Sequence, residues 1–274
     1  MLDSLAELAT AIGRDADAAE LRGRQATMTA TLNSHLWNAE LGIYSNRRSD
    51  TGAFVNRISP FNFHPMLSGA ATPDQADTMA RRWLLSDGGF CLSDQPQSPQ
   101  TGGTQKPCNY GLPSIAHNDS AFNDQNYWCE MAALNLAFLV WYLYQRGGVR
   151  CCFVCLLACL LRGRGGGVPH GCCRTFTPHP IPPHRRGRVW GPMNYLVYAG
   201  LAHPRYAAVA SVQAARKALA TTSGKLLLGE WLDKHHVHEN YDAVSGLGVD
   251  PDSNPFYHWG ALLGYVALLE HGRL

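Results

Sequence analysis

Charge of either sign is scarce in this sequence, and what is present nearly cancels. Lys and Arg number 23 against 21 Asp and Glu, charged residues make up 16% of the chain, and the formal net charge is +2. A protein that binds nucleic acid or an anionic membrane through its general surface carries a clear basic excess. The composition therefore predicts neither a nucleic acid partner nor a membrane partner.

Hydrophobic runs long enough to span a membrane are also missing. Two apolar stretches, 134–144 and 151–161, are separated by the polar segment 145–150, and each is shorter than the roughly 20 residues that cross a bilayer. A membrane hairpin over 132–161 is thus disfavoured. Met1 leads directly into an amphipathic pattern, without the basic segment and apolar core of a secretory leader, so the sequence indicates no compartment.

No segment of any length shows the period-two alternation of a strand. Apolar residues recur instead at helical spacing. The helices predicted from this spacing cover 2–12, 15–36, 73–85, 192–201, 204–221 and a last segment starting near Trp259. The connecting loops include 57–63, with its aromatic tip, and 237–257. Paired helices with functional loops between them are typical of a helical-hairpin toroid, so the fold class is predicted to be all-α.

Residues 129–185 differ in composition from both flanks. They hold seven of the nine cysteines, and six Arg against one acidic residue. The Cys-Cys-x-x-Cys-x-x-x-Cys run lacks the second Cys/His pair of a zinc finger, so no metal site is predicted there. Outside this window, Cys91 and Cys108 are interpreted as buried packing residues without a further role.

The two ends of this window favour a retained intron. Trp128-Cys129-Glu130 can be encoded with GTGAG, a typical intron start, and the Thr-, Pro- and His-rich end at 175–185 is what a pyrimidine-rich tract yields in translation. We therefore predict three segments. Residues 1–128 and 186–274 are parts of one helical toroid, and 129–185 form an unstructured insert.

Removing the insert brings two blocks together as NYW-RGRVWGPMNY, a run rich in aromatic, guanidinium and amide groups. Aromatic faces stack on sugar rings, and Arg and Asn side chains fix hydroxyl groups. The later blocks read GEW, HENYDAVSGLGVD and PFYHWGALLG. Together these blocks resemble glycoside hydrolase family 63, which includes mannosyl-oligosaccharide glucosidases and mannosylglycerate hydrolases, over nearly all of the chain outside 129–185. The resemblance implies the C-terminal portion of an (α/α)6 toroid and an inverting exo-α-glycosidase, α-glucosidase-like, acting on an oligosaccharide or glycoside.

The same resemblance implies roles for individual residues. Glu239, the Glu of the ENY block, matches the family's general base, which activates water for attack. The residues implied for substrate binding are Tyr127, Trp128, Arg186, Gly187, Trp190, Asn194, His258 and Trp259. Trp259 has an equally good alternative role as a core residue of the last helix. Carbohydrate is the partner implied, and no metal or other cofactor is required.

One part of the family pattern is not found. The family's general acid is an Asp in a block of the type ESGLDNSP, and no such block is present. Six helical hairpins also require about twelve helices with their connections, of which the residues outside the insert supply about half. We therefore predict a truncated glycosidase with the base but not the acid. The alternative is a catalytically inactive carbohydrate-binding fragment. The oligomeric state is not predicted.

Overall fold

The computed structural model describes residues 2–93, 110–120, 122, 187–248 and 257–272. Contacts between Cα atoms group Met1–Tyr127 with Arg186–Leu274 in one compact unit. The two flanks of the cysteine-rich window therefore belong together. The window itself lies outside the described residues, so its interpretation as an unstructured, intron-derived insert stays a prediction.

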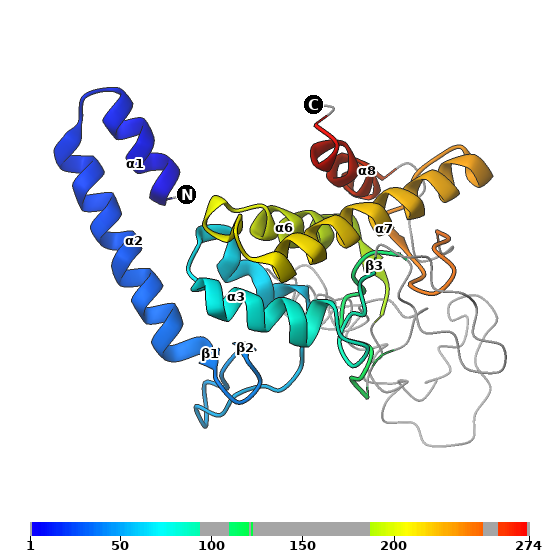
Figure 1. Ribbon diagram of the computed structural model, residues 1–274, viewed down its shortest axis with the longest axis horizontal. Helices are drawn as coiled ribbons and strands as arrows, with labels where there is room; N and C mark the ends of the chain where they lie inside the picture. Colours follow the sequence, from blue (N-terminus) through cyan, green and yellow to red (C-terminus); the bar gives the residue numbers. More distant parts are fainter. Residues whose placement is uncertain (1, 94–109, 121, 123–186, 249–256, 273–274) are drawn as a thin grey trace, which may run out of the picture. The chain divides into compact units, whose positions relative to one another are not determined.

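The chain begins with the predicted helical hairpin. Helices α1 (Leu2–Ala11) and α2 (Asp15–Leu36) lie side by side, joined by a tight turn (Figure 1). Gly13 makes this turn possible because its φ of 74° lies in the left-handed region that favours glycine. Small residues on both helices, Ala6, Ala9 and Ala18, are buried where the two helices pack.

A short hairpin and a 3-10 helix follow. Strands β1 (Trp37–Asn38) and β2 (Ile43–Tyr44) pair antiparallel, and η1 (Pro60–Ser68) is a 3-10 helix. The prediction of a loop over 57–63 therefore holds for 57–59 and is wrong from Pro60 onward. Ser59 and Asn62 form a reciprocal capping box with Pro60 in the first turn, a helix-start arrangement. The helix directs Phe63 into the core, where it is 1% exposed.

The third predicted helix forms as α3 (Pro73–Met79) and continues as a π-helical turn, η2 (Ala80–Leu84). Thr72 caps it by accepting a hydrogen bond from the Gln75 backbone N–H, and the Gln75 side chain accepts one from the Thr72 backbone N–H. This reciprocal pair fixes the helix start predicted from Thr72-Pro73.

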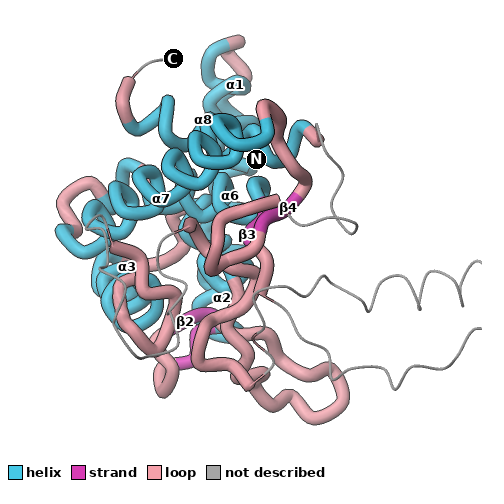
Figure 2. The backbone as a smooth tube through the Cα atoms, turned by 90° about the vertical axis from the view of Figure 1, so that its right-hand side faces the viewer, coloured by secondary structure: helices cyan, strands magenta, loops and turns pink. Residues whose placement is uncertain are grey.

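The C-terminal part consists of three packed helices with two short strands. Its elements are β3 (Val189–Trp190), α6 (Gly191–Leu201), η3 (Pro204–Tyr206), α7 (Ala210–Lys234), β4 (Asn240–Tyr241) and α8 (His258–Glu270). Helices α6, α7 and α8 all contact one another, and α6 also packs on η1 (Figures 1 and 2).

Helix α7 differs at both ends from the predicted helix 204–221. The segment after η3 breaks before Ala210, and the helix then runs through the Thr- and Gly-containing stretch to Lys234. Thr222 tolerates a helical position because its hydroxyl donates to the Ala218 carbonyl. Gly224 fits because a β-carbon there would lie 3.0 Å from Ala267 of α8. The residues that suggest a helix end are thus explained by close packing between α7 and α8.

The main hydrophobic core lies between η1, α3, α6 and α7, around the fully buried Phe63, Met79, Leu201 and Tyr206. The fold class is confirmed as all-α: the strands are two residues long, and the helices carry the core. None of the helices in the described part of the chain is both long and apolar enough to cross a bilayer.

Candidate active site

Four short segments, from three distant parts of the sequence, pair side by side. Strands β3 and β4 are antiparallel, with Val189 opposite Tyr241 and Trp190 opposite Asn240. Isolated bridges extend this pair on both sides, from Pro113 to Val189 and from Tyr241 to Gly248. Figure 2 shows β3 and β4 against the ends of the helices. The ladder brings the Arg-Val-Trp-Gly block directly beside the Glu-Asn-Tyr block.

Two glycines allow the start of α8 to approach this ladder. A β-carbon at Gly191 would lie 1.8 Å from the Trp259 carbonyl oxygen, and one at Gly260 would lie 2.0 Å from the His238 carbonyl oxygen. Distances this short leave room for only a hydrogen atom on the α-carbon, so both positions need glycine. The starts of α6 and α8 and the segment before β4 therefore meet at one point, so all three sequence blocks converge.

Glu239, the predicted general base, occupies this point of convergence. Its residue is partly exposed, while both neighbours, His238 and Asn240, are buried. A strand-like segment whose flanking side chains are buried has its orientation fixed by its neighbours. The carboxylate is thus carried on a rigid segment that remains accessible to solvent.

Arg188 links the two blocks through their side chains. It is 2% exposed, and its Nη1 donates a hydrogen bond of 2.9 Å to Asn240 Oδ1. The sequence interpretation named Arg186 and not Arg188. A basic residue directly before the apolar pair Val189-Trp190 was the sign that could have indicated a buried guanidinium.

Aromatic rings gather next to the ladder. Trp190 is 8% exposed and lies 6.1 Å, centroid to centroid, from the partly exposed Trp259. Tyr257 packs edge-on against Trp259 at 5.2 Å, and the exposed His258 stacks on Tyr257 at 5.0 Å. Trp259 therefore joins the start of α8 to the aromatic cluster, and the residue remains partly exposed. This geometry accommodates both roles considered for it.

Asn194 and Gly187 lie within the packed interior. Asn194 is fully buried, and its amide accepts from Leu112 N and donates to the carbonyls of Leu112 and Trp190. These bonds attach the segment around Leu112 to the start of α6. Asn194 therefore has a structural role in the interior. Gly187 is buried in front of β3. Tyr127, Trp128 and Arg186 lie outside the described residues, so their proposed contacts with sugar stay predictions.

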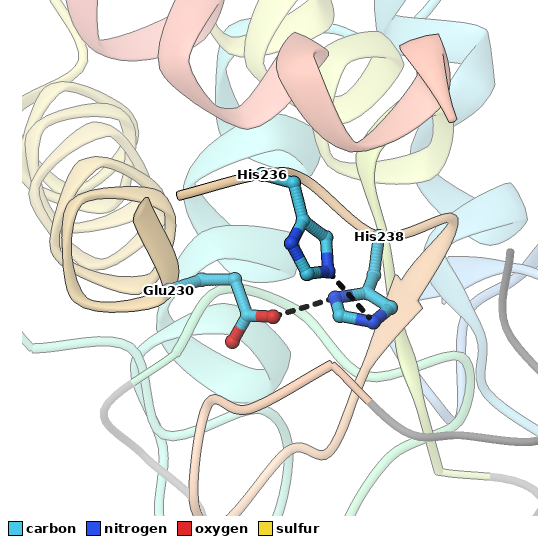
Figure 3. A group of neighbouring side chains, drawn as sticks. All are labelled: Glu230, His236 and His238. Carbon is cyan, nitrogen blue, oxygen red and sulfur yellow. Dashed lines mark hydrogen bonds and ion pairs between the residues drawn. The ribbon is translucent and has the colours of Figure 1, made fainter. Parts of the chain in front are cut away.

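A buried carboxylate, Glu230, supports the loop that carries Glu239. Glu230 Oε1 lies 2.5 Å from His238 Nδ1 (Figure 3), and Oε2 accepts a hydrogen bond from the Gly248 N–H at 3.1 Å. Glu230 belongs to the GEW block, to which the sequence interpretation gave no residue role. An acidic residue on the buried side of an otherwise packed helix was the available sign, because such residues are rarely buried unpaired.

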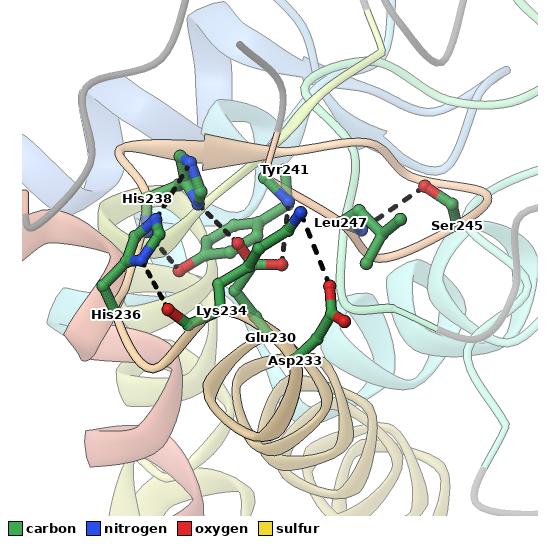
Figure 4. A network of polar contacts seen from close by, with 9 residues as sticks. Glu230, Asp233, Lys234, His236, His238, Tyr241, Ser245 and Leu247 are labelled. Carbon is green, nitrogen blue, oxygen red and sulfur yellow. Dashed lines mark hydrogen bonds and ion pairs between the residues drawn. The ribbon is translucent and has the colours of Figure 1, made fainter.

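Tyr241 completes this network. Its hydroxyl accepts a hydrogen bond from the His238 backbone N–H at 3.0 Å (Figure 4). Burial of the ring raises the pKa of Tyr241 well above its ordinary value, with the nearby Glu230 charge adding to the effect. The phenol therefore stays neutral and holds the segment immediately before Glu239.

One cysteine differs from its sequence interpretation. Cys91 is buried as predicted, at 2% exposed, but it is disulfide-bonded and is not a free thiol. The sequence pattern did not show this pairing, because a disulfide depends on the distance between two side chains in the fold.

Comparison with known proteins defines the class of this fold. Crystal structures of the family 63 mannosylglycerate hydrolase from Thermus thermophilus, in complexes with Tris and with glucose, superpose with TM-scores of 0.54 and 0.53, at 17% identity. Each match covers 97% of this chain but only 42% and 44% of the relative. Neutral trehalase from Saccharomyces cerevisiae matches with a TM-score of 0.50 at 12% identity, over 98% of this chain and 35% of the trehalase. The fold is that of the toroidal α-helical glycosidases, and the chain spans less than half the length of these relatives.

The N-terminal part of the sequence also matches a family model. Residues 2–129 match the model of the mannosylglycerate hydrolase MGH1-like glycoside hydrolase domain. Over this region the chain is similar to a glycosidase family, and the resemblance to glycoside hydrolase family 63 is confirmed there. No curated protein matches the chain.

Proposed function

We propose that this chain contributes the general base, Glu239, to an inverting α-glycoside hydrolase. The observation that carries the proposal is the placement of Glu239. A partly exposed residue stands between two buried residues, His238 and Asn240, on a segment held by Arg188 and Glu230. Asn240 pairs with Trp190, whose ring contacts Trp259. In such an enzyme the base removes a proton from water as the water attacks the anomeric carbon.

Carbohydrate is the proposed substrate class, with an α-linked glucosyl or mannosyl unit. Exposed and partly exposed aromatic rings cluster at the start of α8, where Gly260 meets the His238 carbonyl directly before Glu239, and such rings bind the apolar faces of sugars. The mannosylglycerate hydrolase that shares this fold has been crystallised with glucose.

The general acid is proposed to come from residues that this sequence does not include. A general acid that protonates an ordinary alkoxide leaving group accelerates the reaction by roughly 100- to 10,000-fold. Without the acid, this acceleration is lost. The chain alone is therefore expected to hydrolyse ordinary glycosides very slowly.

A glycosyl fluoride tests the base separately from the acid, because fluoride leaves as a stable anion without protonation. Water forms the new C1–O bond on the face opposite fluorine, Glu239 accepts the proton, and the C1–F bond breaks. The full chain is expected to hydrolyse α-glucosyl or α-mannosyl fluoride, with the β-anomer as the first product in proton NMR spectra.

Matched variants decide the outcome. Glu239→Gln is expected to lower fluoride hydrolysis by roughly 100-fold or more, whereas Asp233→Asn, at an exposed carboxylate, should leave the rate unchanged. Equal rates for Glu239→Gln and the unaltered chain would overturn the assignment of the base. Sugar binding without any fluoride hydrolysis would instead support the carbohydrate-binding fragment.

A further inference from the structure

Two histidines next to the proposed base point their ring nitrogens at each other. His236 and His238 follow the C-terminal end of α7, and their Nε2 atoms lie 3.4 Å apart (Figure 3). The rings themselves are 4.6 Å apart, centroid to centroid. Glu230 completes the group, since one ligand atom from each of the three residues lies within 4.8 Å of the others.

The protonation state of each ring follows from the partner of its other nitrogen. His236 Nδ1 lies 2.8 Å from the Lys234 carbonyl oxygen, which only accepts hydrogen bonds (Figure 4). His238 Nδ1 lies 2.5 Å from the Glu230 carboxylate. Both Nδ1 atoms therefore carry hydrogen, and in the neutral rings both Nε2 atoms carry a lone pair.

Two lone pairs directed at each other at this distance repel, unless a positive species lies between them. A proton on one ring satisfies this requirement, and so does a metal ion bound to both rings. Two nitrogens bound at about 2.0–2.1 Å to a tetrahedral zinc ion lie about 3.3–3.4 Å apart, which is the separation found here.

The surroundings also have the form of a metal site. A histidine that binds a metal through one nitrogen almost always donates from the other nitrogen to a carboxylate or backbone carbonyl, which fixes the ring and raises its basicity. Here Glu230 fills that role for His238 and the Lys234 carbonyl fills it for His236. Glu230 and His238 are 0% and 1% exposed, so this half of the site is rigid, while the partly exposed His236 leaves an entry path.

We propose that His236 and His238 bind a divalent transition-metal ion through their Nε2 atoms, with Glu230 orienting His238. Imidazole ligands favour zinc, copper and nickel over magnesium and calcium, which prefer oxygen ligands. The proposal does not depend on the glycosidase assignment, because metal binding is measured without a sugar.

Calorimetric titration of the full chain with Zn²⁺ tests the site, after free thiols have been blocked with iodoacetamide so that cysteines do not bind the metal. One zinc site is expected to disappear, or to weaken at least about tenfold, in His236→Gln. The matched control is His235→Asn, at an exposed neighbour outside the group, which should retain the site. Mg²⁺ should give no binding heat at it.

Glu230→Gln provides a graded second test. It keeps both imidazoles but removes the orienting charge, so zinc affinity is expected to fall by roughly 10- to 100-fold. Circular dichroism checks that this buried substitution leaves the helices intact. If Glu230→Gln unfolds the chain, the zinc titration of His236→Gln alone tests the proposal. Equal zinc stoichiometry and affinity in His236→Gln and His235→Asn, or no zinc binding in the unaltered chain, would overturn the proposal in favour of a shared proton.

Discussion

Arg188 and Asn240 are 52 positions apart in the sequence, and a buried 2.9 Å hydrogen bond joins their side chains. This bond connects the Arg-Val-Trp-Gly block to the residue immediately after Glu239. The block after the cysteine-rich window and the block that carries the proposed base therefore form one site through direct contact.

Arg188→Ala is expected to destabilise the chain by about 3 kcal/mol. The substitution removes a charge-assisted hydrogen bond and leaves Asn240 in a buried position with that bond lost. Urea denaturation followed by circular dichroism measures the change. Arg24→Ala is the control, because Arg24 belongs to an exposed pair with Glu20, and such pairs contribute about 1 kcal/mol or less. Similar losses in both variants would contradict the structural role of Arg188.

Gly260→Ala is expected to lower stability by about 1–3 kcal/mol or prevent folding. Its new methyl group would meet the His238 carbonyl oxygen at 2.0 Å and the Tyr241 hydroxyl at 2.6 Å. Thermal denaturation measures the shift. Gly229→Ala provides the opposite case, since this exposed α7 glycine has no neighbouring atom within 4 Å of a new β-carbon. It should gain about 0.5–1 kcal/mol from reduced backbone entropy in the unfolded chain.

Asn194→Ala is expected to cost several kcal/mol, because it leaves three buried backbone groups at Leu112 and Trp190 without this partner, each worth about 1–3 kcal/mol. Chemical denaturation checks this value. Asn46→Ala, at an exposed position, should change stability by less than about 0.5 kcal/mol. A neutral Asn194→Ala would show that its amide is not needed to hold α6 against the segment at Leu112.

Asp77 links α3 to α7 in a pH-dependent way. The Ser211 hydroxyl, followed by Arg81, lowers the pKa of Asp77. Because the pKa is lower in the folded chain than in the unfolded chain, the resulting stability is present above the unfolded value of about 3.9. It is lost as the pH falls through the folded value.

Ser211→Ala is therefore expected to reduce stability at neutral pH and to flatten its decline in acid. Melting temperatures measured from pH 7 down to about 3 test this expectation. Ser34→Ala is the control, since Ser34 is exposed and its hydroxyl donates to a backbone carbonyl. Parallel pH profiles for Ser211→Ala and the unaltered chain would refute a contribution from Asp77.

Elements with strong local patterns were predictable from sequence. The α1–α2 hairpin, the start of α3 at Thr72-Pro73 and the last helix are determined by apolar spacing, by a capping pair and by a turn glycine. The 3-10 helix at Pro60 and the continuation of α7 past Thr222 were missed. Their stability comes from side-chain capping and from contact with another helix, which composition does not show.

The candidate site was predictable to the extent that its residues fall in recognisable blocks. Glu239, Trp190 and Trp259 were named from those blocks, and the structure brings their segments together. Glu230 and Arg188 were not identified, because their importance depends on burial and on partners far away in the sequence. The roles of Glu239 and of the residues proposed to contact sugar stay predictions until the glycosyl fluoride experiment is done.

The narrow ladder that connects Pro113, Val189, Tyr241 and Gly248 has a consequence for folding kinetics. Its bridge between Tyr241 and Gly248 is local, but the pairing of Val189 with Pro113 and with Tyr241 waits until long stretches of chain have been brought together. The helical hairpin α1–α2 needs no such closure. Glu239 is thus expected to reach its place late in folding, and backbone amides along the ladder should exchange with solvent deuterium sooner than those at the centre of α7.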